Sequence, residues 1–407
     1  MSGWLALAVT LVVIGGVADA PGLIVVAAIT AGYGTLTRLW TRYGVRSVTY
    51  ERRLGASRAV AGDSVALDIT IWNRKPLPLP WIAADDMLTE GLVVRERPDL
   101  DHADDRQQRR LLRNTWALTW YERVVRHFHL DDLRRGAYEL GPARLRLRDV
   151  FGRDAAEEQL TERETLTVVP RSRPVTHLPE DRSPLGERRA PRSLIADPAL
   201  FSGVRPFQPG DSLRRVHWRA TARLGIPVSR RFEPARGRTV VIAMDVQTLD
   251  DVPHWEMSYD DDAFEGLCVI AASLARHLLD DGAVVGVAAA SFTGTPQRIA
   301  WLAPRAGRGQ VARVGEMLAR IGPVSSMPYE ALLSWLARRL PAGSSVVALT
   351  SRDPRPLRPV LQRLARSGFA VEAIRAGGAW SGDGAGFPVH AAHLLPDWRT
   401  ADGLRIS

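Results

Sequence analysis

The chain has 407 residues, which is enough for two or three domains with sizeable cores. Its net charge is +9, but Lys75 is the single lysine among 54 basic residues, and this excess of arginine points to a GC-rich genome rather than to nucleic-acid binding. The one cysteine, Cys268, excludes an internal disulfide and a cysteine-based metal site.

Two apolar runs open the chain. Neither Trp4–Ala18 nor Pro21–Thr37 contains a charged residue, so we expect a transmembrane helical hairpin over residues 1–40 that contacts membrane lipid. By the positive-inside rule, the arginines after the second run predict a cell-membrane protein with two spanning helices and large cytoplasmic domains. These arginines are Arg38, Arg42, Arg46, Arg52 and Arg53.

A secretory signal peptide is the alternative for this region. Ala18-Asp19-Ala20 resembles a small-residue cleavage site. The missing positive charge at the amino terminus and the second apolar run argue against it.

Residues 45–170 show a period of two. Val65, Leu67, Ile69 and Ile71 alternate with small or polar residues, as half-buried strands do. We expect a small antiparallel β-sandwich here. Residues 171–200 contain five prolines in close order and predict a linker.

The next segment, residues 201–237, is rich in arginine. Pro209-Gly210 predicts a tight turn, and the carboxylate of Asp211 is suited to cap a helix that begins at Ser212. Seven arginines lie between Phe201 and Glu233, namely Arg205, Arg214, Arg215, Arg219, Arg223, Arg230 and Arg231. Such guanidinium groups can bind carboxylates or phosphates in fixed geometry.

Two interpretations of these arginines stay open. In the first, Arg205, Asp211 and Arg215 pair among themselves and hold the segment against the following domain. In the second, Arg214, Arg219 and Arg223 project from the helix and dock an acidic partner.

The segment resembles the bacterial membrane proteins grouped as domain of unknown function number 58. The shared pattern is carried by Gly203, Arg205, Pro209, Gly210, Asp211, Arg214, Val216, Trp218, Ala222 and Arg223. Phe207 stands where the family usually has Tyr, and His217 where it more often has Asp. The resemblance extends into the predicted sandwich, in Gly62-Asp63 and Asp149-Val150-Phe151-Gly152.

This resemblance implies structural and functional roles. It implies a partner-binding role for Arg205, Asp211, Arg214, Arg219 and Arg223, and a structural role for Gly203, Pro209, Gly210 and Trp218. It also implies a MoxR-type AAA+ ATPase as partner and, beside it, a transglutaminase-like membrane protein.

Residues 238–380 predict an α/β domain with a doubly wound sheet, followed by a tail over 381–407. The apolar run Thr239–Asp245 predicts a buried parallel strand, and further strands are expected at 283–290, 298–302, 345–350 and 370–374. Helical periodicity lies between them, at 264–278, 309–321, 329–340 and 356–367. Ligands of such sheets bind at the carboxyl ends of strands, where Asp245 and Asp353 lie.

The arrangement resembles a von Willebrand factor type A domain. Metal-binding members end the first strand with Asp-x-Ser-x-Ser, whereas this chain has Asp245-Val246-Gln247-Thr248-Leu249. Leu249 offers no oxygen, so the candidate ligands Asp245, Gln247 and Asp353 predict at best a degenerate Mg²⁺ site, and we expect no cofactor.

We expect no catalytic residue, since the chain lacks both a Gly-x-Ser-x-Gly nucleophile motif and a phosphate-binding Gly-x-x-x-x-Gly-Lys motif. The predicted function is that of a membrane-tethered cytoplasmic adaptor, a cofactor of a MoxR-type AAA+ ATPase. The alternative is a hydrolase of the cell envelope in which His217 and Asp211 supply acid–base chemistry.

Overall fold

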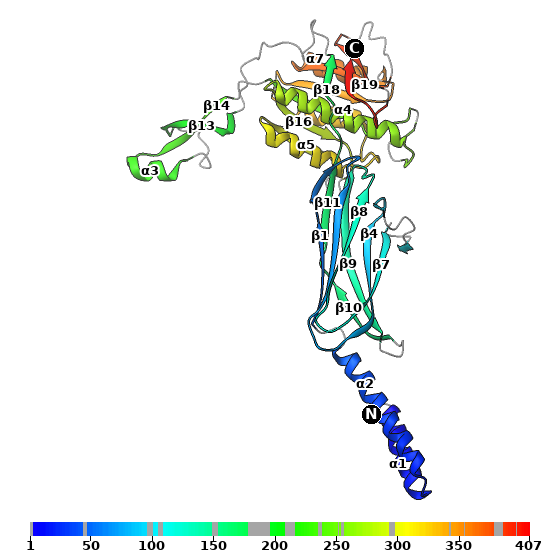
Figure 1. Ribbon diagram of the computed structural model, residues 1–407. Coiled ribbons are helices and arrows are strands. Elements are labelled where there is room, and N and C mark those ends of the chain that lie inside the picture. The colour runs from blue at the N-terminus through cyan, green and yellow to red at the C-terminus, as the bar shows by residue number, and fades with distance from the viewer. Residues whose placement is uncertain are drawn as a thin grey trace. The chain divides into compact units, whose positions relative to one another are not determined.

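The computed structural model forms two compact units, Met1–Val168 and Val169–Ser407 (Figure 1). The residues that the structure describes are 3–43, 47–95, 101–104, 109–148, 154–177, 196–207, 216–234, 238–250, 252–253, 256–292, 298–341, 343–353, 355–377, 386–395 and 397–407.

Two helices begin the first unit, α1 (Gly3–Val17) and α2 (Pro21–Tyr43). The 15 residues of α1 span about 22 Å at 1.5 Å per residue, well short of the ~30 Å hydrocarbon core of a bilayer. The longer α2 carries Arg38 and Arg42 near its end. Over the described residues, no helix is both long and apolar enough to cross a membrane. The predicted transmembrane hairpin is therefore wrong, and so is the localisation of a two-helix membrane protein that rested on it.

Two antiparallel sheets make up the rest of this unit. The first has the strand order β1 (Val48–Leu54), β3 (Val65–Asn73), β8 (Arg123–Asp131) and β5 (Val93–Val94). The second has the order β2 (Arg58–Val60), β11 (Glu164–Val169), β9 (Gly136–Arg148), β4 (Leu79–Thr89), β7 (Arg109–Leu118) and β6 (Asp101–Asp104), with β10 (Asp154–Leu160) also paired to β9.

The inner faces of the two sheets share one apolar core. Leu67 and Ile69 of β3 are fully buried in it, together with Ile82 of β4 and Leu147 of β9. The alternation in residues 65–71 therefore marks a real strand with one face in the core.

A buried polar cluster also links the two sheets. The hydroxyl of Tyr50 in β1 donates to Oδ2 of Asp86 in β4 at 2.9 Å, and Nη1 of Arg52 pairs with Oδ1 at 2.5 Å. Burial raises the pKa of Asp86 to about 6, although Arg52 and the Tyr50 hydroxyl favour the charged form. The Asp86 carboxyl group therefore changes its charge at a pH of about 6, where proteins are ordinarily folded.

An eight-stranded sheet is the centre of the second unit. Its strand order is β12 (Val175–His177), β21 (Gly403–Ile406), β20 (Val389–Leu395), β19 (Ala370–Ala376), β18 (Ser345–Thr350), β15 (Thr239–Met244), β16 (Val284–Ala289) and β17 (Ala300–Arg305). The five strands from β20 to β16 are parallel, whereas β17 and β21 run antiparallel to their neighbours β16 and β20.

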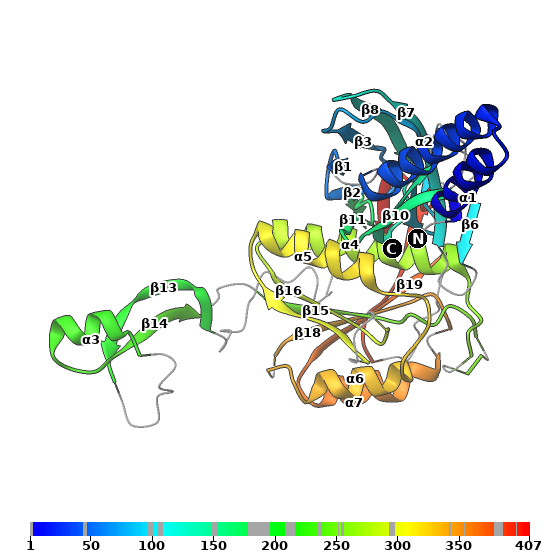
Figure 2. The same ribbon diagram turned by 90° about the horizontal axis from the view of Figure 1, so that it is seen from below.

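Helices cover both faces of this sheet (Figure 2). α4 (Asp261–Asp280) and α5 (Arg308–Arg320) cover one face, and α6 (Tyr329–Ala337) and α7 (Arg358–Arg366), which follows the short 3-10 helix η2 (Arg355–Leu357), cover the other. Each face has its own apolar core. All six residues of β15 are buried, as its continuous apolar sequence predicts for a strand between two helical layers.

The predicted fold class needs correction beyond the amino-terminal helices. The expected tail contributes β20 and β21 to the sheet, and the expected linker contributes β12, which pairs in parallel with β21. Over the described residues, strands contain more of the chain than helices do, and no helix is long and apolar enough to cross a membrane, so the predicted combination of a transmembrane hairpin with a type A domain over 238–380 is wrong. The strands β12, β20 and β21 were not predicted because they lack a long apolar run and because distant parts of the chain determine their pairing.

Candidate functional site

The arginine-rich segment folds as two paired strands with a helix in their connection. β13 (Ala196–Pro206) pairs antiparallel with β14 (Val228–Pro234), and Arg205 lies opposite Ser229 in the register. Helix α3 (Trp218–Leu224) lies between them in the sequence. The backbone N–H of His217 donates to the carbonyl of Val228 at 2.9 Å, which ties the start of α3 to β14.

Two caps define this short helix. Nδ1 of His217 accepts a hydrogen bond from the backbone N–H of Ala220 at 3.2 Å, so His217 is the N-cap. Gly225, in the left-handed conformation with φ of 70°, ends the helix. The described helix therefore starts at Trp218, while the predicted start at Ser212 lies outside the described residues.

The predicted site residues fall into three groups. Gly203 and Arg205 lie in β13, and Arg219 and Arg223 are exposed on α3. Pro209, Gly210, Asp211 and Arg214 lie outside the described residues. Trp218, expected to be a structural residue, has a side chain that is 67% exposed.

A second cluster surrounds Asp245 at the carboxyl end of β15. The Asp245 side chain is 1% exposed. Its Oδ2 accepts hydrogen bonds from Nε and Nη2 of Arg352 at 2.9 and 2.8 Å and from the Thr350 hydroxyl at 3.0 Å. Oδ1 accepts from the backbone N–H of Gln247 at 3.1 Å. Burial raises the pKa of Asp245, and Arg352 opposes that shift.

This cluster lies where ligands of doubly wound sheets bind. From β15 the chain continues to β16 on one side, whereas β18, β19 and β20 extend the sheet on the other. The ends of β15 and β18 therefore flank the switch point of the topology. Arg352, which follows β18, places a guanidinium group there.

The other two metal candidates have different partners. The side-chain amide of Gln247 donates to the carbonyl of Val252 at 3.1 Å. Asp353 forms an ion pair with Arg355, whose hydrogen bonds lower the pKa of the Asp353 carboxyl group. Among the described residues, no group of three or more His, Cys, Asp or Glu side chains could hold a metal ion.

Sequence reasoning missed the partner of Asp245. Arg352 is one of many arginines, and its distance of more than 100 positions from Asp245 gives no local signal. The sequence feature that could have indicated Arg352 as a site residue is its position two residues after Thr350, where a strand was predicted to end.

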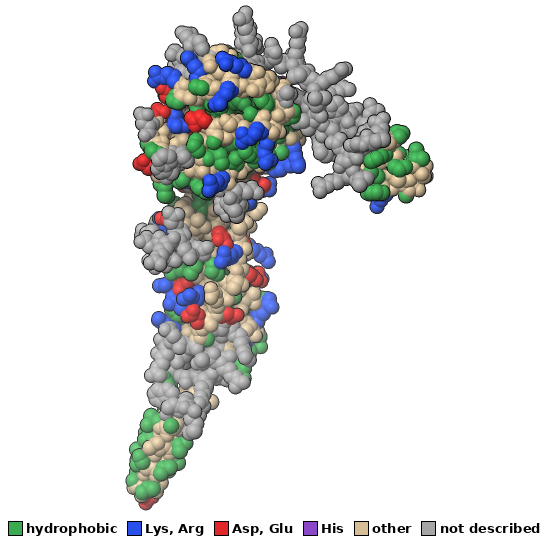
Figure 3. All heavy atoms as spheres, turned by 180° about the vertical axis from the view of Figure 1, so that it is seen from behind, with side chains coloured by type: hydrophobic (Ala, Val, Ile, Leu, Met, Phe, Trp, Pro, Cys, Tyr) green, Lys and Arg blue, Asp and Glu red, His purple; other side chains and the backbone are tan. Residues whose placement is uncertain are grey.

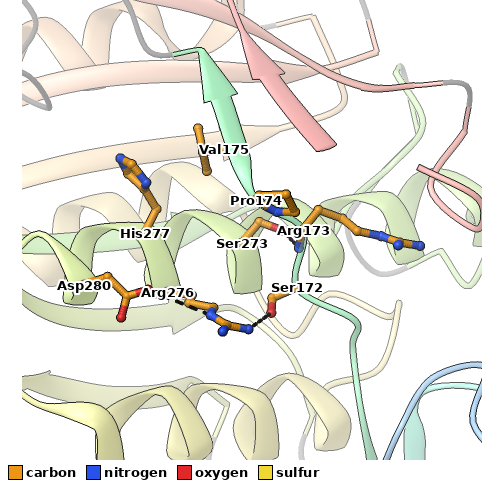
Figure 4. A pocket seen from close by; sticks show the side chains of 8 residues that line it. All are labelled: Ser172, Arg173, Pro174, Val175, Ser273, Arg276, His277 and Asp280. Carbon is orange, nitrogen blue, oxygen red and sulfur yellow. Dashed lines mark hydrogen bonds and ion pairs between the residues drawn. The ribbon is translucent and has the colours of Figure 1, made fainter. Parts of the chain in front are cut away.

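A cavity of about 350 Å³ lies beside α4 (Figure 4). It is lined by Ser172, Arg173, Pro174, Val175, Ser273, Arg276, His277 and Asp280. Nη1 of Arg276 donates to the Ser172 hydroxyl at 3.2 Å, and the buried Ser273 hydroxyl accepts from the backbone N–H of Arg173 at 2.8 Å. These contacts hold the segment before β12 against α4, which is a structural role.

Comparisons with known proteins agree with the resemblance seen in the arginine-rich segment. The family model described as "Protein of unknown function DUF58" matches residues 203–348. The uncharacterized protein YeaD of Bacillus subtilis (strain 168) is 24% identical over 256 residues, which cover 60% of this chain and 56% of that protein. This chain thus matches little more than half the length of that relative.

Similarity to solved structures is low. The CARDB domain of the PF1109 protein from Pyrococcus furiosus, solved with di-metal ions, is 11% identical, with a TM-score of 0.19 over 30% of this chain and 94% of that chain. A beta-glucosidase from Listeria innocua is 12% identical, with a TM-score of 0.19 over 30% of this chain and 16% of that chain. Neither establishes a shared fold.

Proposed function

We propose that this chain is an interaction protein rather than an enzyme, and that it docks a MoxR-type AAA+ ATPase. The observation that supports docking is the exposure of Trp218, Arg219 and Arg223 on α3, within the segment that carries the family pattern. Exposed aromatic and arginine side chains are the residue types that contribute most to protein interfaces. The identity of the partner rests on the family resemblance.

The cluster at the switch point gives no support to catalysis or metal binding by Asp245. A catalytic or metal-ligating carboxylate needs an oxygen that can reach a substrate or an ion. Asp245 is buried and already accepts four hydrogen bonds, three of them at Oδ2. Arg352 neutralises its charge from within the chain.

The hydrolase alternative gains no support from the contacts of His217. Its Nδ1 accepts a hydrogen bond from the backbone of its own helix, which is the contact of a capping residue. Its expected acid–base partner, Asp211, lies outside the described residues.

Charge reversal tests the proposed function. The Arg214→Glu, Arg219→Glu, Arg223→Glu variant should bind the purified ATPase at least tenfold more weakly than the wild type, with weaker dependence on salt. A matched control, Arg320→Glu, Arg363→Glu, Arg366→Glu, makes the same change in net charge at exposed positions of α5 and α7. It should bind like the wild type.

Three results would contradict the proposal. The wild-type chain could fail to bind the ATPase, the first variant could bind it as tightly as the wild type, or both variants could lose affinity equally. The last result would show that net charge matters and that the segment does not.

A further inference from the structure

The surface of α3 is organised in two adjacent ridges. Trp218 and Ala222 are four residues apart and lie on one face of the helix, and Arg219 and Arg223 repeat the same spacing beside them. All four are exposed, and no residue of α3 is buried. The helix thus presents an apolar ridge next to a cationic one.

The local structure holds this helix without using either ridge. Val216 and Val228, which flank the connection to β14, are buried. The Thr221 hydroxyl accepts from the backbone N–H of Val228 at 3.2 Å. A seven-residue helix is too short to be stable by itself, so these contacts and the caps at His217 and Gly225 fix it in place before any partner binds.

Two more large apolar side chains of this region are exposed. Leu224 and Ile226, at the carboxyl end of the helix, are 56% and 53% exposed, in addition to Trp218 at 67%. Hydrophobic side chains gather on this part of the surface beside a basic one (Figure 3). Exposed apolar side chains that gather on a protein surface usually mark a site where another molecule binds. Trp218 and Ala222, which lie on one face of α3, are called the α3 patch below.

The positive charges of Arg219 and Arg223 beside the α3 patch favour a different protein with acidic side chains as the partner over a second copy of this chain. In an antiparallel two-fold contact between two copies of this chain, the patch would meet itself, and the Arg219 and Arg223 ridges would be brought together. Like charges placed in an interface oppose association. A different protein with carboxylates at the matching positions removes this conflict.

We propose that the α3 patch inserts Trp218 into an apolar slot of a partner protein whose rim carries Asp or Glu side chains. Trp218 is the centre of the contact, and Arg219 and Arg223 pair with the acidic rim. This inference rests on the proposed interaction function and specifies the residues and the partner chemistry for it.

The test combines a binding measurement with crosslinking in cells. The variant Trp218→Ala should lose affinity for the purified ATPase about 30-fold or more, as expected for a central aromatic residue. A photoreactive benzoylphenylalanine at Ala222 of the full chain should crosslink to the partner. The same residue at Trp120, which is exposed on the first unit, is the control and should not.

The outcomes separate this inference from the proposed function. If the ATPase binds but Trp218→Ala binds equally and Ala222 gives no crosslink, the α3 patch is wrong and the proposed function stands. The other case is a crosslink from Ala222 to another protein, at an apolar site flanked by carboxylates, whose binding in purified form requires Trp218. The ATPase is then not the partner, and the proposed role of the α3 patch stands.

Three other outcomes would overturn the inference directly. These are a crosslink from Ala222 to a second copy of this chain, binding to anionic lipid vesicles that requires Trp218, and no crosslink above the Trp120 control.

Discussion

The guanidinium group of Arg352 donates two hydrogen bonds to one oxygen of Asp245, from Nε at 2.9 Å and from Nη2 at 2.8 Å. The two residues follow neighbouring parallel strands, and the pair lies at the switch point of the sheet. A positive charge from the chain itself therefore lies where an open α/β sheet would otherwise receive a ligand. The consequences for stability and for metal binding can be measured separately.

Removal of Arg352 should destabilise the second unit. Arg352→Leu leaves the Asp245 carboxylate buried without its counter-charge, and we expect a loss of about 3 to 5 kcal/mol in the free energy of unfolding. Urea unfolding followed by circular dichroism measures it. Arg355→Leu is the control, because the ion pair of Arg355 with Asp353 is exposed and its loss should not change stability measurably.

The double variant Arg352→Leu, Asp245→Leu gives the decisive comparison. Removal of both charges should restore part of the stability, because no uncompensated charge stays buried. If Arg352→Leu by itself unfolds at the same urea concentration as the wild type, the pair does not stabilise the unit.

Magnesium should bind weakly or not at all at Asp245. The Oδ2 oxygen is used by Arg352 and Thr350, and Leu249 offers no ligand where a metal-binding sequence has a hydroxyl. Titration calorimetry of the full chain with MgCl₂ should show no saturable heat. Micromolar binding that disappears in Asp245→Ala would show that the carboxylate is open to a cation after all.

The two sheets of the first unit should respond to the charge of Asp86. Its pKa of about 6 in the folded state lies above its ordinary value of 3.8, so the folded state holds the proton more tightly than the unfolded state. The stability contributed by protonated Asp86 is full below pH 4 and is lost as the pH rises through about 6. The loss should be on the order of 3 kcal/mol.

Asp86→Asn isolates this effect, because the variant lacks the titrating group. Hydrogen exchange of the backbone amides in β1 and β4 reports the opening free energy of these strands. Between pH 4.5 and 7.5, the wild type should lose protection relative to the variant. Parallel pH profiles for the two proteins would show that Asp86 does not titrate in this range.

Local patterns predicted much of the second unit. The apolar run after Arg238 becomes β15, and the expected strand at 345–350 is β18. Both are strands with helices on both faces, so each needs a continuous apolar sequence that is easy to recognise. The strands β12 and β21 were missed, because they pair across more than 200 residues and contain only three and four residues.

The candidate site was harder to predict, for a different reason. The resemblance implied a structural role for Trp218, whereas α3 packs through its turns and caps and leaves the indole exposed. Arg352 was not recognised, since its partner is remote in the sequence. Hydrophobic periodicity shows which residues are able to be buried, and it does not show whether a neighbouring element covers them.

The stability of the arginine-rich segment provides the last prediction. Because Trp218 is 67% exposed, Trp218→Ala should reduce stability by less than about 1 kcal/mol, whereas the 3 to 5 kcal/mol typical of a buried tryptophan is not expected. Val228, 2% exposed, is the matched comparison, and Val228→Ala should cost about 2 kcal/mol. Hydrogen exchange of the β14 amides measures both, since these amides report the paired strands directly.

The comparison also decides how a binding defect of Trp218→Ala is interpreted. If β14 keeps its protection in Trp218→Ala and loses it in Val228→Ala, the indole contributes little to the fold, and lost partner binding in the first variant reflects a lost contact. If both variants lose protection equally, Trp218 holds the segment together, and lost partner binding in Trp218→Ala reflects lost structure instead of a lost contact.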